Sequence, residues 1–315
     1  MGINENKPIP LVSISCITYN HAPYIRQCLD GFMMQKTNFV FEVLIHDDAS
    51  TDGTTEIIKE YEKKYPDIIK PIYEKENQWV KGRRGSAVFN IPRAKGKYIA
   101  LCEGDDCWIE PCKLQKQVDV MEKDTSCSLV ISNGIISYLK QGKESIINPL
   151  GDIESQYVGI DSLLKEGGGL IPTASMMCKK DLYMNMPNFF KEAPVGDRPL
   201  RMWLAINGRV YYMSEPTIMY RAGTVGSFGE RTSNNYEYAK FIYEKMEVFF
   251  NKYNEYTNGK YDSLISYMKD REKYLFCLRT RNMLLSFKTD YFKSKPLFVR
   301  IKQYIKYIIN IFYKI

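Results

Sequence analysis

Three apolar runs of the sequence each end in a short polar segment, and this repeated pattern restricts the chain to few folds. The runs cover residues 11–17, 39–45 and 98–102. Apolar residues at helical spacing follow the first two, over about 23–34 and, after a cap at Thr51 or Asp52, over about 57–65. Strands alternating with helices predict an α/β fold with a mostly parallel sheet, which binds ligands at the carboxyl ends of its strands. We therefore expect the three polar segments to lie along one edge of the sheet.

The third run leads directly into three carboxylates, Glu103, Asp105 and Asp106. Acids this close repel one another unless solvent screens them, protons neutralise them or a cation lies between them. Mg²⁺ prefers oxygen ligands and usually takes only one or two carboxylates, with water and phosphates completing its shell. The turn is therefore a candidate seat for a metal and a diphosphate, and an ordinary exposed acidic turn is the alternative.

Composition narrows the class of protein. Apolar residues make up 44% of the 315 residues, ample for a core, and a net charge of +7 does not call for a nucleic-acid partner. The eight cysteines form no C-x2-C pair and only two histidines are present, so we expect reduced thiols rather than a zinc site. The sequence shows no secretory signal and no apolar run of about 18 residues, which predicts a cytoplasmic protein without a spanning helix.

The second half of the chain is less regular. A strand is expected at 128–132, a helix at about 199–207 and a strand at 209–213. Beyond about residue 236 the sequence turns to long helical patterns rich in Tyr, Lys and Glu. We therefore predict a catalytic domain over residues 1–235 and a helical carboxyl-terminal region over 236–315.

Four motifs, in this order and spacing, resemble the family 2 glycosyltransferases. They are residues 12–20 (VSISCITYN), 47–52 (DDASTD), 94–108 (AKGKYIALCEGDDCW), and Gly196-Asp197 followed by Gly208 and Tyr220-Arg221. The resemblance covers roughly residues 10–225. It implies the GT-A fold, a Rossmann-like sheet flanked by helices, and an inverting sugar transfer.

The resemblance also implies which residues hold the donor. Thr18, Tyr19, Asn20 and Asp48 would bind the nucleotide, and a carboxylate at Asp48 can accept the N3 hydrogen of uracil, which cytosine lacks. Arg84 matches a basic position facing the nucleotide, although it can equally be a solvated loop residue. A helix cap is the other role open to Asp48.

The same resemblance assigns the acidic turn. Asp106 would be the most direct ligand of Mg²⁺ or Mn²⁺, with Glu103 and Asp105 toward the ribose, diphosphate or metal-bound water. In the family this motif is usually Asp-x-Asp, and Glu103 at its first position departs from that pattern. Which of the three acids takes which role therefore stays open.

Asp197 corresponds to the family's general base. It would take the proton of the acceptor hydroxyl as that oxygen attacks the anomeric carbon opposite the leaving diphosphate, whose charge the metal stabilises. Arg198 or Arg201 would keep this carboxylate ionised. Capping a helix is the structural alternative for an aspartate in Gly-Asp-Arg-Pro.

The last twenty residues, 296–315, place apolar side chains on one half of a helical wheel and Arg and Lys on the other, with no acid. Such a helix can lie on an anionic membrane, where lipid-linked sugar acceptors reside. Docking on the catalytic domain or on a partner chain is the alternative.

Together these features predict an inverting glycosyltransferase that moves a sugar, expected to come from a UDP-sugar, to a glycan or lipid-linked glycan in surface polysaccharide synthesis. It would be cytoplasmic or peripheral on the cytoplasmic face of a membrane. A nucleotidyltransferase is one alternative, but its Gly-rich, basic phosphate loop does not match residues 18–22. A non-catalytic nucleotide- or glycan-binding module of the same fold is the other.

Overall fold

A computed structural model of the chain describes residues 8–82, 85–165 and 171–312. The chain forms two compact units. The first comprises residues 1–191 and 197–222, and the second comprises 192–196 and 223–315. This division falls after Ala222, whereas the change of sequence character suggested residue 235.

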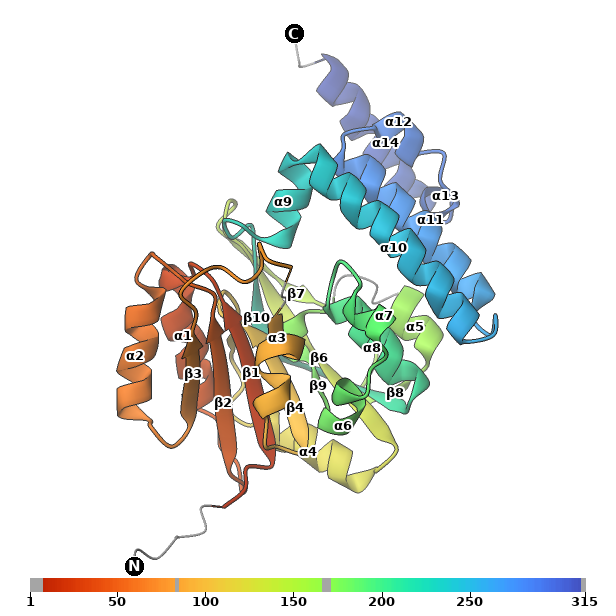
Figure 1. The fold of residues 1–315 in the computed structure, drawn as a ribbon. Helices are drawn as coiled ribbons and strands as arrows, with labels where there is room; N and C mark the ends of the chain where they lie inside the picture. Colours follow the sequence, from red (N-terminus) through yellow and green to blue (C-terminus); the bar gives the residue numbers. More distant parts are fainter. Residues whose placement is uncertain (1–7, 83–84, 166–170, 313–315) are drawn as a thin grey trace, which may run out of the picture. The chain divides into compact units, whose positions relative to one another are not determined.

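One mixed sheet organises the first unit, with strands in the order β3-β2-β1-β4-β9-β6-β10-β5, β7 on β6 and β8 on β10 (Figure 1). The strands are β1 (Val12–Thr18), β2 (Phe41–Asp47), β3 (Ile69–Tyr73), β4 (Tyr98–Glu103), β5 (Cys107–Trp108), β6 (Cys127–Tyr138), β7 (Lys143–Ile147), β8 (Gln156–Val158), β9 (Met177–Lys179) and β10 (Arg209–Ala222). β3, β2, β1 and β4 are parallel as predicted, whereas β9 runs antiparallel to both of its neighbours. The carboxyl ends of β1, β2 and β4 therefore share one edge.

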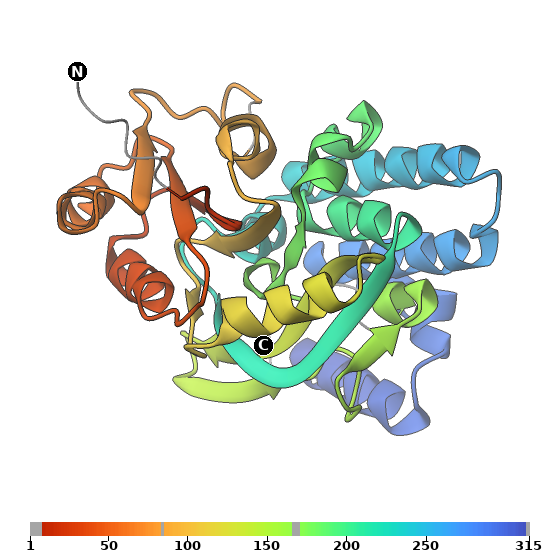
Figure 2. The same ribbon diagram turned by 90° about the horizontal axis from the view of Figure 1, so that it is seen from below.

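Helices cover this sheet on both faces. They are α1 (Ala22–Met33), α2 (Thr54–Lys64), α3 (Gly85–Phe89), α4 (Lys113–Lys123), α5 (Ile160–Lys165), α6 (Lys180–Met184), α7 (Asn188–Lys191) and α8 (Asp197–Ile206), with 3-10 turns η1 (Ile91–Arg93) and η2 (Thr173–Ser175). Figures 1 and 2 show α1 and α2 on one face of the β3-β2-β1 part and α3 on the other.

The two faces of β1 differ in chemistry because successive strand residues point in opposite directions. Ile14 and Cys16 belong to the apolar core that also contains Phe32 of α1. Ser13 and Ser15 face the other way, buried but satisfied by hydrogen bonds to Glu42 Oε1 (2.6 Å) and Ser86 Oγ (2.9 Å). Pairing on both edges and packing on both faces fix β1, and with it the loop that follows.

β10 is longer than the sequence pattern predicts. The sequence predicts a strand only over 209–213, and Pro216 beyond it cannot donate a ladder hydrogen bond. In the structure the strand passes Pro216 through a register shift against β6 and continues to Ala222. This continuation brings Tyr220 and Arg221 to the same edge as the acidic turn.

The second unit is helical. Its helices are α9 (Phe228–Asn234), α10 (Tyr236–Tyr256), α11 (Asp262–Arg279), α12 (Met283–Ser286), α13 (Asp290–Lys293) and α14 (Leu297–Phe312). Tyr274, Phe287 and Phe292 form a small aromatic cluster in this unit, against which Tyr307 of α14 packs. Within the described residues, no helix is both long enough and apolar enough to cross a bilayer.

Candidate active site

The loop after β1 is built by Thr18, Tyr19, Asn20 and His21. Asn20 has φ +54°, a left-handed conformation that asparagine tolerates. Its N–H donates to Ser50 Oγ (2.9 Å) and its Oδ1 accepts from Thr51 N–H (2.8 Å), so Asn20 ties this loop to the one after β2. Tyr19 is 46% exposed. Thr18 is buried, and its hydroxyl finds no hydrogen-bond partner among the described residues.

Asp48 does not cap a helix. Its Oδ1 accepts from Gln78 N–H (2.6 Å) and its Oδ2 from Trp79 N–H (3.2 Å), so the carboxylate anchors the segment after β3. The Asp48 N–H also donates to Thr18 O (3.0 Å), which places Asp48 beside the first loop. Each carboxylate oxygen can still accept a further hydrogen bond.

Asp52 binds the amino termini of two helices. Its Oδ1 accepts from Thr54 N–H (3.1 Å) at the start of α2, and its Oδ2 accepts from Ala22 N–H (2.9 Å) at the start of α1. The residue in the N-cap position of α2 is Gly53 rather than Thr51 or Asp52. Asp52 nevertheless satisfies a free amide of α2, as an N-cap side chain would.

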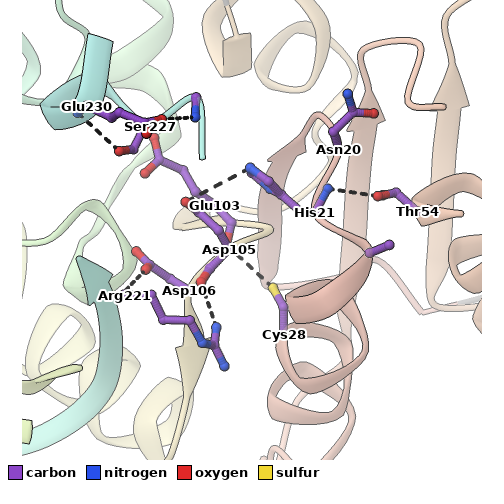
Figure 3. A network of polar contacts seen from close by, with 12 residues as sticks. Asn20, His21, Cys28, Thr54, Glu103, Asp105, Asp106, Arg221, Ser227 and Glu230 are labelled. Carbon is purple, nitrogen blue, oxygen red and sulfur yellow. Dashed lines mark hydrogen bonds and ion pairs between the residues drawn. The ribbon is translucent and has the colours of Figure 1, made fainter. Parts of the chain in front are cut away.

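The acidic turn is seated directly on the loop after β1. Gly104 N–H donates to Ile17 O (2.9 Å). A Cβ added to Gly104 would lie 2.6 Å from Thr18 Oγ1 and 3.0 Å from His21 Nδ1, so only glycine fits here. His21 Nε2 lies 4.0 Å from Asp105 Oδ2 (Figure 3). Burial lowers the pKa of His21, although the carboxylates of Asp105, Asp52 and Asp47 act in the opposite direction.

Asp106 is the buried member of the turn, only 1% exposed. Its Oδ1 accepts from Arg221 N–H (2.9 Å), whereas its buried Oδ2 has no partner within the part of the chain that the structure describes. Burial raises the pKa of Asp106 well above its usual range, and the carboxylates of Asp105 and Glu103 raise it further. A buried acid surrounded by like charge is an unfavourable arrangement that a cation would relieve.

The fit of this turn to a metal can be judged from its donor atoms. In residues 8–82, 85–165 and 171–312, no three histidine, cysteine, aspartate or glutamate side chains gather as a group that could hold a metal ion. The unpartnered Oδ2 of Asp106 fits the other kind of site, in which one carboxylate binds Mg²⁺ or Mn²⁺ and water and substrate phosphates supply the remaining ligands.

Asp197 is the first residue of α8 and is 35% exposed in its side chain. Its Oδ2 lies 3.4 Å from Nη2 of Arg201, a guanidinium that is 1% exposed and also donates to Ile171 O (2.7 Å). The phenol of Tyr220 is influenced by Asp197 and by the acids of the turn. Burial chiefly raises the pKa of Tyr220, and the carboxylates of Asp106, Glu103, Asp105 and Asp197 add to the effect, so its phenol lies within electrostatic range of all four.

The structure thus brings together the loop after β1, Asp48 and the acidic turn. Arg84 lies outside the described residues. Two residues of this region were not predicted as site residues, Arg221 and His21. Both lie inside or beside quoted motifs, but nothing in the sequence shows that β10 ends against the acidic turn or that His21 faces Asp105.

The arrangement of strands and helices defines the class of protein. The fold is that of the GT-A glycosyltransferases. Similar structures include Staphylococcus aureus TarS 1-349 in complex with UDP-GlcNAc (16% identity, TM-score 0.55, covering 87% of this chain and 83% of that one). Another is the mannosyltransferase PcManGT of Pyrobaculum calidifontis in complex with GDP-Man and Mn²⁺ (14% identity, TM-score 0.55, covering 98% and 83%).

The sequence assigns the chain to one family within this class. It belongs to glycosyl transferase family 2, whose sequence model matches residues 13–182. Uncharacterised proteins of Mycobacterium bovis and Mycobacterium tuberculosis are 34% identical over 214 residues, which cover 67% of this chain and 58% of theirs. The match therefore spans little more than half of these relatives. The putative teichuronic acid biosynthesis glycosyltransferase TuaG of Bacillus subtilis is 35% identical over 119 residues (38% of this chain, 44% of TuaG).

Proposed function

We propose that this family 2 glycosyltransferase transfers a sugar from a UDP-sugar, with inversion, to a glycan or lipid-linked glycan of a surface polysaccharide. The observation that carries the proposal is the seating of the acidic turn on the loop after β1. Gly104 leaves no room between the two segments, so a nucleotide bound at Thr18 would have its diphosphate next to Asp106. The similarity to TuaG and to a UDP-GlcNAc complex supports the substrate classes.

Each site residue has a role in this reaction. Asp48 would accept the N3 hydrogen of uracil with the free lone pairs of its carboxylate, and the unpartnered Thr18 hydroxyl would bind the nucleoside. Asp106 would hold Mg²⁺ or Mn²⁺, and such an ion neutralises charge on the departing diphosphate. Asp197 would take the proton of the attacking hydroxyl, and the neighbouring Arg201, whose Nη2 lies 3.4 Å from Asp197 Oδ2, would orient this carboxylate.

The donor is tested by thermal melting with Mn²⁺ and a panel of nucleoside diphosphates and their sugars. A ligand that binds the native state raises the melting temperature by mass action. UDP compounds should raise it, whereas CDP compounds, which lack the N3 hydrogen, should not. Release of UDP on addition of acceptor then separates an enzyme from a binding module. Equal shifts with CDP and UDP would contradict the role of Asp48, and no shift with any nucleotide would contradict the proposed function.

We also propose that α14 attaches the protein to an anionic membrane. Tyr304 and Tyr307 pack on Phe287 (ring centroids 4.4 and 5.6 Å apart), so one side of α14 is held by its own unit. A second side exposes large apolar residues, namely Leu297, Phe298, Ile301, Ile305 and Ile308. Residues 288–315 carry seven basic side chains and one acidic one, most of the net charge of the whole chain. An exposed apolar stripe in a basic segment is complementary to an anionic bilayer.

A further inference from the structure

Arg221 is a buried arginine that contacts both the acidic turn and helix α1. Its Nη1 donates to Asp105 O (2.6 Å), and its own N–H donates to Asp106 Oδ1 (2.9 Å) (Figure 3). Its Nη2 donates to Gln27 Oε1 and lies 3.7 Å from Cys107 Sγ. Arg221 thus joins two successive residues of the turn and one residue of α1, through its backbone amide to Asp106 and its side chain to Asp105 and Gln27.

The position of Arg221 follows from the register of β10. Met219 pairs with Cys107 and Ile218 with Trp108 in an antiparallel ladder, so the strand that carries Arg221 runs back along the acidic turn. The guanidinium also lies 5.2 Å from the ring centroid of Tyr24 on α1. Because α1 begins at Ala22, directly after the loop of Thr18 to His21, the contacts of Arg221 connect the acidic turn to the helix that follows the first predicted ligand-binding loop.

The energetics indicate a specific role for this side chain. A guanidinium is expensive to bury unless its donors are satisfied, and here its named hydrogen-bond acceptors are a carbonyl, an amide and a thiol rather than a paired carboxylate. The amide of Arg221 binds Asp106 Oδ1, and Oδ2 of the same carboxylate has no partner among the described residues.

We propose that Arg221 is a positioning residue that fixes the Asp105–Asp106 turn against α1, so that Asp106 Oδ2 faces the metal-diphosphate of the donor. This inference rests on the proposed function, because it assigns Arg221 a part in the same site. Arg221 itself need not touch the substrate, since its contacts are to Asp105, Asp106, Gln27 and Cys107. Groups that orient a metal ligand typically change metal affinity about 10- to 100-fold when they are replaced.

The test compares UDP binding by calorimetry with Mn²⁺ and with EDTA in the full chain and three variants. Arg221→Lys keeps the charge but loses the forked donor geometry. Gln27→Ala removes the partner of Nη2 on α1 and does not alter the groups that bond Arg221 to Asp105 and Asp106. Arg209→Lys is the matched control, because Arg209 lies on the same strand but forms an exposed ion pair with Asp124 (2.8 Å). Melting of each variant without ligand reports whether it folds.

With Mn²⁺, Arg221→Lys should bind UDP at least about tenfold more weakly, and Gln27→Ala about 2- to 10-fold more weakly. Arg209→Lys should bind as the wild type does. With EDTA the UDP affinities of all four proteins should agree, because a positioning role affects only the binding that depends on the metal. A general loosening of the fold would instead lower the affinity in EDTA as well. A loss of UDP affinity that occurs with Mn²⁺ but not with EDTA is the result that supports a positioning role.

Folded Arg221→Lys that binds UDP and Mn²⁺ like the wild type would overturn the inference. If Arg221→Lys fails to fold, Gln27→Ala decides, and its unchanged binding would overturn the inference equally. Wild-type protein that binds no nucleotide with Mn²⁺ would instead contradict the proposed function, together with this inference. A loss of equal size with Mn²⁺ and with EDTA would assign Arg221 to the stability of the fold alone.

Discussion

Replacing Gly104 by alanine tests whether the acidic turn and the loop after β1 form one site. The added Cβ would lie 2.6 Å from Thr18 Oγ1, 2.8 Å from Thr18 Cβ and 3.0 Å from His21 Nδ1. Favourable contacts between carbon atoms need about 3.5–4.0 Å. Thr18 cannot turn away easily, because it is a β-branched residue at the buried end of β1. The turn itself must therefore move away from the loop.

The expected cost follows from this overlap. Overpacking by one carbon in a well-packed region destabilises a protein by about 1–3 kcal/mol. For a unit of this size, each kcal/mol lowers the melting temperature by about 2–4 °C, so the variant should melt about 2–12 °C lower. Displacing Asp106 should also weaken Mn²⁺-dependent UDP binding by about tenfold or more, as expected when a metal ligand loses its orientation.

Gly159→Ala is the matched control, because a Cβ there meets nothing within 4 Å and its φ is not positive. It should change stability by less than about 0.5 kcal/mol and leave binding unchanged. Thermal melting without ligand and calorimetry with UDP and Mn²⁺ provide both readouts. If Gly104→Ala matches the control in melting and in binding, the turn is not seated on the loop as described and the site argued above is wrong.

Three further predictions address single residues and α14. Asp197→Asn should keep donor binding but lower transfer by about 100-fold or more, measured as UDP release with acceptor; unchanged turnover would remove Asp197 from the mechanism. Asp106→Asn should lose Mn²⁺-dependent UDP binding. Because folding raises the pKa of Asp106, the unbound wild type should lose stability as pH rises above about 4, the pKa in the unfolded chain. In urea titrations, the stability of Asp106→Asn relative to wild type should therefore increase over that pH range. Parallel stability curves for the two proteins would contradict the pKa argument. The double variant Ile301→Ser/Ile305→Ser should no longer float with anionic vesicles, while the melting of the second unit stays unchanged. Val248→Ser, at an exposed position on α10, is the control and should float as the wild type does. Flotation of the double variant would exclude this face of α14 as the membrane contact.

The sequence could predict the parts of the fold that local patterns encode. Apolar runs ending in polar segments gave β1, β2 and β4, and parallel topology then placed their carboxyl ends on one edge. The carboxylates of residues 103–106 were therefore expected on the same edge as the loop after β1, although only the strand order shows that β4 lies next to β1. Helical spacing in the last residues predicted α14 in the same way. These features depend on residues close together in the chain, for which periodicity is informative.

Only the tertiary structure decided what each side chain contacts. Asp48 could cap a helix or face a ligand; in the structure its carboxylate binds the amides of Gln78 and Trp79, and Asp52 binds the amide of Thr54 at the start of α2. The predicted strand ended at residue 213, yet pairing with β6 carries β10 past Pro216 and brings Arg221 to a turn more than a hundred residues earlier in the chain. Whether a charged residue is solvated or buried against a distant segment depends on long-range packing, and local sequence carries no record of that packing.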